Sequence, residues 1–331
     1  MNKVKFSPNI KLDKKLLKNL LSKCLVKDFP VVIKLHFGEP GNPHAFTPED
    51  VKPLLEAITE LGFKTILTDT PVAYNSPRNS KIGYEQVIKD RGYTVLSECY
   101  VEDQYVEQQM GDFKFEVAKI LAEAKNLIVL THVKGHECAG FGGAIKNLGM
   151  GALSAKSKSA IHNASTPVID PDLCIGCGIC AQACPAKAIT IQNAKAHPDL
   201  DLCYGCSICQ MVCPQQALQP QLKYFDEALA MGAMAAVKLM PKNTFYISVL
   251  KNIAKACDCE GHASPILAKD IGILFADNPV VIDQASIDLI NKKEGKDVFF
   301  LANRKNPQLQ IDYAANYAGL KKDYQLETLK D

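Results

Sequence analysis

The chain has 331 residues, of which 47% are hydrophobic and 22% are charged, a normal balance for a globular protein with one large or two ordinary domains. Lys and Arg number 38 against 36 Asp and Glu, so the net charge is +2. This near-neutral charge excludes the strong positive field of an obligate nucleic-acid or anionic-membrane binder, and we expect neither partner.

Hydropathy predicts no membrane-spanning segment. Residues 1–15 are polar and basic with no apolar stretch behind them, unlike a secretory signal. The longest apolar stretch, residues 228–240, is too short to cross a bilayer and contains Lys238. We therefore expect a cytoplasmic protein in which this stretch is a buried helix.

Residues 1–165 alternate between predicted strands and helices. After an amphipathic helix over 16–25, strands are predicted at 31–35, 64–68, 93–96 and 127–130, and helices at 48–61, 84–91 and 113–124. Thr47 is a plausible N-cap for the helix at 48–61. Such alternation favours a mostly parallel α/β sheet covered by helices.

A glycine-rich loop at residues 131–151 lies between a predicted strand and a predicted helix. Free amides at the helix start could hold an anion or a cofactor such as flavin, with Gly140, Gly142, Gly143 and Lys146 as the candidate residues. The string fits neither the Walker pattern nor the dinucleotide fingerprint. Close backbone packing is the alternative interpretation.

An internal repeat follows, in which residues 172–180 align with residues 201–209. Each copy closes with a fourth cysteine and a proline, so the run C-x2-C-x2-C-x3-C-P occurs twice. Three thiolates of one run curl around an iron-sulfur cube, while the fourth points to the other cube. The predicted ligands are Cys174, Cys177, Cys180 and Cys213 for one cluster, and Cys203, Cys206, Cys209 and Cys184 for the other.

These residues resemble the bacterial two-cluster ferredoxins, which implies two [4Fe-4S] clusters and one-electron transfer. Gly176 and Gly205 are expected to take positive φ and bring amides close to sulfur. A pair of zinc sites is the alternative, but zinc usually needs two C-x2-C pairs. Within this module, acidic residues outnumber basic ones, which predicts a redox protein partner with a positively charged docking face. The residues counted are Asp170, Asp172, Asp199 and Asp201 against Lys187 and Lys195.

Residues beyond 220 continue the α/β pattern. Helices are predicted at 224–239 and 283–290, and strands at 245–249 and 271–275. We therefore expect residues 1–165 and 221–331 to form one α/β domain, with residues 166–220 as an inserted α+β module of bacterial ferredoxin type. A separate C-terminal domain is the alternative.

A third metal site is predicted at Cys257-Asp258-Cys259, which is followed by His262. The string places two thiols and an imidazole within reach of one ion, and Cys138, with His132 or His136, could complete the site. Thiols without a ligand are the alternative interpretation.

Several blocks resemble the family catalogued as domain of unknown function 362. They are residues 140–151, the Cys257-Asp258-Cys259 triplet, residues 270–274 and residues 277–285, where Asn278-Pro279-Val280-Val281 replaces the more usual Asp-Pro-Val-Ala. The resemblance implies an α/β domain that carries a two-cluster insert, and it implies no activity.

Two functions fit these features. The first is an iron-sulfur protein that passes single electrons to or from a partner. The second is an iron-sulfur oxidoreductase whose α/β domain holds its own active site with a cofactor or an extra metal. A purely structural role for the clusters is a third interpretation.

Overall fold

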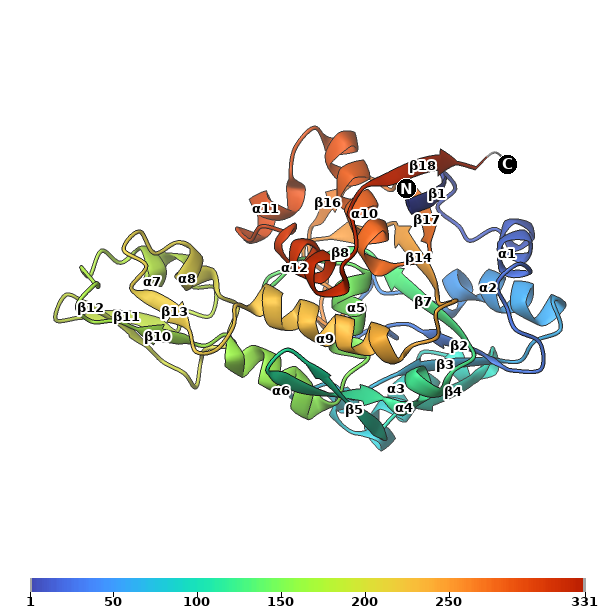
Figure 1. The fold of residues 1–331 in the computed structure, drawn as a ribbon, viewed down its shortest axis with the longest axis horizontal. Coiled ribbons are helices and arrows are strands. Elements are labelled where there is room, and N and C mark those ends of the chain that lie inside the picture. The colour runs from blue at the N-terminus through green and yellow to red at the C-terminus, as the bar shows by residue number, and fades with distance from the viewer. Residues whose placement is uncertain (1, 330–331) are drawn as a thin grey trace.

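The computed structural model describes residues 2–329, which build a mixed, mostly parallel eight-stranded sheet (Figure 1). Parallel pairing joins β14, β7, β2, β3 and β4, whereas β17 is antiparallel to both of its neighbours. This confirms the predicted α/β class. The strand order is β18 (Tyr324–Thr328), β1 (Asn2–Ser7), β17 (Gly272–Ala276), β14 (Phe245–Leu250), β7 (Asn126–His132), β2 (Val31–Lys34), β3 (Thr65–Asp69) and β4 (Glu98–Val101).

Helices cover both faces of this sheet. Val31 and Ile33 pack with the layer of α1 (Lys14–Leu21), α2 (Pro48–Glu60) and α3 (Lys81–Asp90). Val32, between them, packs with the opposite layer, whose helices are α5 (Ala144–Gly151), α9 (Phe225–Leu239), α10 (Pro279–Glu294), α11 (Val298–Asn303) and α12 (Leu309–Ala318). Burial on both faces explains why the strands read as continuous apolar runs.

The helix boundaries follow from their caps. Thr47 and Asp50 form the predicted capping box of α2. Helix α10 begins earlier than predicted because Asn278 caps it and Pro279 occupies its first turn, and it ends at Gly295 in the left-handed conformation. Helix α9 is the expected buried helix, and no helix within residues 2–329 has the length and apolar character to cross a membrane.

Two predicted elements between residues 93 and 124 differ from the structure. Tyr93–Val95 forms a short 3₁₀ turn, and strand β4 follows it. The first half of the helix predicted at 113–124 is strand β6 (Phe113–Ala118), which pairs with β5 (Tyr105–Met110), and the helix is limited to the short α4 (Lys119–Glu123). Phe115 and Val117 are buried at a spacing of two, which is the period of a strand.

The cysteine-rich segment projects from the body, at the left of Figure 1. Its ends, β10 (Pro167–Ile169) and β13 (Leu218–Pro220), pair antiparallel. Strand β7 precedes this segment in the sequence and β14 follows it, and these two strands are neighbours in the main sheet. Helix α6 (Ala155–Ala164) comes directly before the segment. Between its ends lie α7 (Ile179–Ala183), β11 (Ile189–Gln192), β12 (Lys195–Pro198) and α8 (Ile208–Met211).

Two further small hairpins extend beyond the carboxyl ends of β7 and β14. They consist of β8 (Lys134–His136) with β9 (Gly140–Gly142), and of β15 (Ile253–Ala254) with β16 (Ile266–Ala268). The predicted glycine-rich loop and the Cys257-Asp258-Cys259 triplet lie in these hairpins and their loops.

Candidate functional site

A first cavity in the projecting segment is lined by four cysteines. Three come from the first cysteine run and one from the end of the second: Cys174, Cys177, Cys180 and Cys213. Ile175 and Ile191 also line the cavity. Cys177 is exposed to solvent, so this cavity lies near the surface.

A second cavity is lined by the reciprocal set of cysteines. Three belong to the second run and one closes the first run: Cys203, Cys206, Cys209 and Cys184. Cys206 and Cys209 are only 9% and 7% exposed. The cysteines of the two cavities therefore differ in their access to solvent.

Backbone amides donate hydrogen bonds to several of these sulfurs. Gly205 donates to Sγ of Cys203 at 3.4 Å, and Ala188 donates to Sγ of Cys184 at 3.2 Å. Gly176 and Gly205 have φ of +66° and +64°, as predicted. A Cβ at Gly205 would lie 2.0 Å from the carbonyl oxygen of His162, so only glycine fits where this loop meets the body.

Replacing Gly205 with alanine should therefore prevent the second cysteine run from closing around its cavity. Gly62 is a matched control because it has φ of +88° and no atom within 4 Å of the position of a Cβ. Gly62→Ala should cost about 1–2 kcal/mol of unfolding free energy from backbone strain alone. Gly205→Ala should cost more and lower the iron content after anaerobic reconstitution, whereas equal effects in denaturant titrations and iron assays would contradict this prediction.

The spacing of the sulfurs limits which group they can hold. Two thiolates on one zinc are at most about 4.6 Å apart, because each Zn–S bond is about 2.3 Å. Across residues 2–329, the group of three or more candidate ligands whose atoms all lie within 4.8 Å of one another is His136, Cys257 and Cys259. The cysteines of the two cavities do not meet this criterion, so their spacing fits a larger inorganic group better than a single ion.

Burial disfavours free thiolates in the second cavity. It raises the pKa of Cys206 to about 11 and that of Cys209 to about 12. Thiolates at neutral pH therefore need a bound cationic group in this cavity.

The second cavity faces the α/β body. The His162 imidazole donates from Nδ1 to the carbonyl of Tyr204 at 2.7 Å, and Tyr204 lines the cavity. The buried Lys305 ammonium donates to the carbonyl of Cys206 at 2.8 Å, and it pairs with the buried carboxylate of Asp226. These contacts attach the second cysteine run to α9 and to the C-terminal part of the chain.

The first two amides of α5, which follows the glycine-rich loop, are already bonded within the chain. An anion or cofactor held by Gly140, Gly142, Gly143 and Lys146 stays a prediction. The amides of Ala144 and Ile145 donate to the two carboxylate oxygens of Asp283 at 2.6 and 2.8 Å. A Cβ at Gly143 would lie 2.3 Å from Asp283 Oδ1, and one at Gly140 would lie 2.6 Å from the carbonyl of Lys305. A side chain from α10 thus occupies the position predicted for an external anion.

Asp283 should make stability depend on pH. Burial raises its pKa to about 7, even though the two amide bonds lower it. An unfolded aspartate has a pKa near 3.9, so between about pH 4 and pH 7 the folded state binds more protons and stability falls as pH rises. We expect a loss of about 1–2 kcal/mol between pH 5.5 and 7.5 in denaturant titrations. Asp283→Asn should be less stable but lack this pH-dependent component, and an unchanged pH dependence would contradict the prediction.

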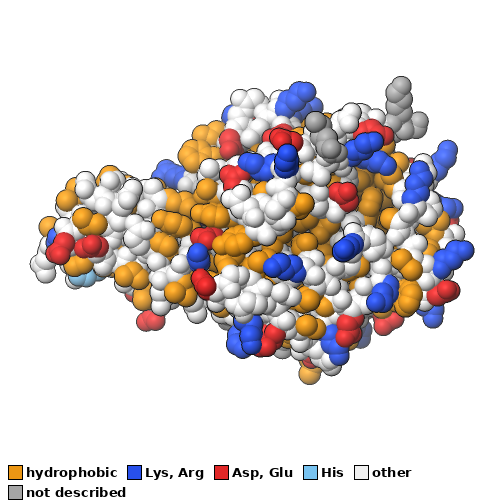
Figure 2. Space-filling model, viewed as in Figure 1, with side chains coloured by type: hydrophobic (Ala, Val, Ile, Leu, Met, Phe, Trp, Pro, Cys, Tyr) orange, Lys and Arg blue, Asp and Glu red, His pale blue; other side chains and the backbone are white. Residues whose placement is uncertain are grey.

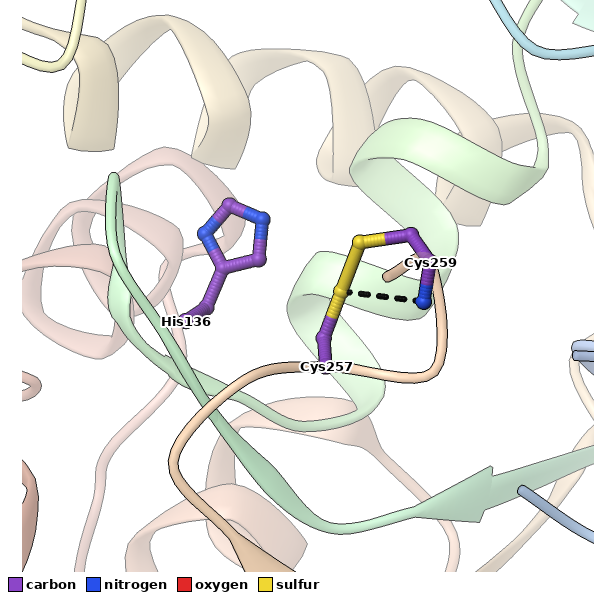
Figure 3. Close-up of side chains that lie close together, drawn as sticks. All are labelled: His136, Cys257 and Cys259. Carbon is purple, nitrogen blue, oxygen red and sulfur yellow. Dashed lines mark hydrogen bonds between the residues drawn. A yellow bond between two sulfur atoms is a disulfide. The ribbon is translucent and has the colours of Figure 1, made fainter. Parts of the chain in front are cut away.

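The two cysteines of the Cys257-Asp258-Cys259 triplet are joined by a disulfide, and the His136 imidazole faces it (Figure 3). The Cys259 amide donates to Sγ of Cys257 at 3.3 Å, and the Lys146 ammonium lies 3.7 Å from the same sulfur. Burial lowers the pKa of Lys146 to about 8. His136, Cys257 and Cys259 could hold a metal when both sulfurs are reduced.

Cys138 and His262, which the sequence also suggested, are not part of this group. Cys138 is buried, and its main-chain amide donates to Nδ1 of His136. His132 Nδ1 instead lies 3.0 Å from the carboxylate of Asp258, and Lys134 lies 3.6 Å from the same side chain. Burial alone would raise the pKa of Asp258, but these two partners hold it below its ordinary value.

The chain matches the family described as Domain of unknown function (DUF362) over residues 31–288. The chain belongs to this family. The DUF362 match includes strands β2, β3, β4, β7 and β14, the cysteine-rich segment and the Cys257-Asp258-Cys259 triplet. It confirms the family-level resemblance predicted from the sequence, and its description assigns no activity.

Two solved structures have a limited likeness to this DUF362 chain. The lactate racemase apoprotein from Thermoanaerobacterium thermosaccharolyticum is 13% identical, with a TM-score of 0.35 over 75% of this chain and 50% of that one. A protein from Thermotoga maritima is 8% identical, with a TM-score of 0.42 over 92% of this chain and 58% of that one. The DUF362 chain thus spans about half the length of each of these proteins. No curated protein matches it.

A buried charge cluster in this DUF362 protein was missed by sequence reasoning. At the carboxyl ends of β2 and β3, Lys34 lies 3.1 Å from Asp69, and Arg78 lies 2.6 Å from Glu39. Lys158 is also buried near them, and burial lowers its pKa to about 7. Lys34, which lies inside the apolar run 31–35, was the one signal in the sequence for this buried charge cluster. The carboxyl ends of parallel strands are where open α/β sheets usually bind ligands.

Proposed function

We propose that this protein is an iron-sulfur electron-transfer protein that carries two [4Fe-4S] clusters. One cluster would be held by Cys174, Cys177, Cys180 and Cys213, and the other by Cys203, Cys206, Cys209 and Cys184. The observation that carries the proposal is the lining of the two cavities, since each combines three cysteines of one run with the last cysteine of the other. That exchange is the ligation pattern of two-cluster ferredoxins.

Two further observations support this proposal over zinc. The cysteines of each cavity are too widely spaced to converge on one ion. Main-chain amides donate to Cys174, Cys184 and Cys203, and such hydrogen bonds stabilise the reduced form of a cluster.

The first cluster is the proposed point of contact with a redox protein partner. Cys177 and Ile175 are exposed beside its cavity, and other apolar side chains nearby are also exposed: Leu173, Ile179 and Ile191. Figure 2 shows acidic side chains among apolar ones near the tip of the projecting lobe. A partner with an apolar contact surface and a positively charged rim would complement this end of the molecule.

The second candidate function is an oxidoreductase with its own active site in the α/β domain. The orientation of the second cavity favours it, because Tyr204 and Cys206 contact His162 and Lys305 of the body. A simple carrier has no need for a cluster buried against a second domain. Electrons received at the exposed cluster would instead move inward.

Anaerobic purification followed by iron, sulfide, zinc and flavin analysis tests the proposal. Two [4Fe-4S] clusters require about eight iron and eight sulfide per chain. Zinc at stoichiometric amounts, or iron without sulfide, would contradict it. Flavin found together with the clusters would favour the oxidoreductase.

A further inference from the structure

A series of packed side chains connects the second cavity to the Cys257–Cys259 disulfide. His162, which donates to the carbonyl of Tyr204, has its ring 5.0 Å from that of Phe225. Phe225 is stacked on His136 at a ring separation of 6.5 Å. A nitrogen of His136 lies within 4.8 Å of both sulfurs. Figure 3 shows the imidazole and the disulfide facing each other, from β8 and from the loop that holds the triplet.

We propose that Cys257–Cys259 is a redox-active disulfide that accepts electrons from the iron-sulfur module and passes them on to a disulfide substrate. The inference rests on the proposed function, because the clusters are its electron source. The disulfide would be the electron acceptor inside the α/β domain, which the oxidoreductase function requires.

The disulfide has little value as a structural crosslink. The stabilisation that a disulfide gives by restricting the unfolded chain grows with the length of the loop it closes, and here only Asp258 separates the two cysteines. The same chain carries eight cysteines whose proposed role needs them reduced. A disulfide among such thiols fits a redox role better than a structural one.

The loop around the disulfide is held in place independently of the S–S bond. Asp258 is fixed by His132 and Lys134, as described above. Asn42 donates from its side chain to the carbonyl of Glu260 at 2.9 Å, and the Glu39 amide donates to the carbonyl of Asp258 at 2.8 Å. Opening the bond would therefore leave both sulfurs close together, ready to form the bond again.

Reduction breaks the S–S bond and uses two electrons, supplied one at a time through the clusters, and two protons taken up from solvent. The ammonium of Lys146 and the amide of Cys259 both lie close to Sγ of Cys257, where they would stabilise negative charge. Cys257 is 7% exposed, whereas Cys259 is partly exposed and is the sulfur that a substrate can reach.

Thiol–disulfide exchange then completes the cycle. The Cys259 thiolate attacks the substrate disulfide, forms a mixed disulfide and releases one substrate thiol. Cys257 attacks Cys259 in that mixed disulfide, which releases the second substrate thiol and restores the Cys257–Cys259 bond. The protein thereby converts single electrons into the two-electron reduction of a disulfide.

The test follows the clusters and the disulfide in the same sample. Anaerobic holoprotein is reduced with electrochemically reduced methyl viologen, quenched in acid and alkylated, and labelling of Cys257 and Cys259 is read by peptide mass spectrometry beside the visible spectrum. We expect both cysteines to be labelled after reduction and protected before it. Iron-free protein given the same donor should lack this labelling, although dithiothreitol should open the bond in both forms.

Two variants test the route. Phe225→Leu should retain the clusters but slow the cluster-dependent labelling in a time course, whereas Phe113→Leu, a control in the β5–β6 hairpin, should behave as the wild type. Reduced clusters beside a disulfide that stays closed would overturn this inference and leave the proposed function intact. So would equal labelling in iron-free protein, or a stoichiometric metal retained by His136, Cys257 and Cys259. A reconstituted sample without clusters would instead refute the proposed function.

Discussion

Replacing Cys184 with serine should damage the cluster in the cavity of Cys203, Cys206 and Cys209, and spare the one nearest Cys184 in sequence. The physical reason is that Cys184 lines the second cavity, although it closes the first cysteine run. Iron content should fall from about eight toward about four per chain. The electron paramagnetic resonance spectrum of the reduced variant should match that of Cys203→Ser and differ from that of Cys174→Ser.

The control for this experiment is Cys24→Ser, because Cys24 is partly buried beside α1, outside the projecting segment. It should leave iron content and spectra unchanged. A Cys184→Ser spectrum identical to that of Cys174→Ser would contradict the crossed ligation.

Removing the iron should unfold much of the projecting segment while the main sheet stays folded. The small apolar cluster of buried residues within this segment consists of Cys180, Ile189, Ala196, Cys209 and Leu218, so two proposed ligands form part of it. A core this small buries too little apolar surface to stabilise the segment alone.

Hydrogen exchange of holoprotein and iron-free protein measures this effect. We expect amides of β11 and β12 to lose protection in the iron-free form, whereas those of β7 and β14 keep it. The α8 region should change less, because Ile208 packs with the core of the body. Equal protection of β11 and β12 in both forms would show that the clusters do not stabilise the segment.

Much of the fold could be predicted from the sequence because the signals for its helices and strands are local. The capping residue Thr47 and the apolar runs of β2, β7 and β14 each predicted their own element. Only the second half of the helix predicted at 113–124 is helical. The alternation of Phe113, Phe115 and Val117 was the signal for a strand.

The site was less predictable because its key contacts join distant residues. Asp283 accepts a hydrogen bond from Ala144, the first residue of α5, although the two lie 139 residues apart in the sequence. Local sequence does not reveal which charged side chain will occupy such a position. The sequence analysis left open whether His132 or His136 would complete the metal site predicted at Cys257 and Cys259. Tertiary packing places His136 at the sulfurs and pairs His132 with Asp258.

Mössbauer spectroscopy of protein reconstituted anaerobically with ⁵⁷Fe distinguishes iron-sulfur clusters from single-metal sites, because it reports the environment of every iron atom in the sample. We expect the iron to be present as four-iron clusters, at about eight atoms per chain. Iron in isolated tetrahedral thiolate sites, or a protein that excludes iron and binds zinc at these cysteines, would contradict it.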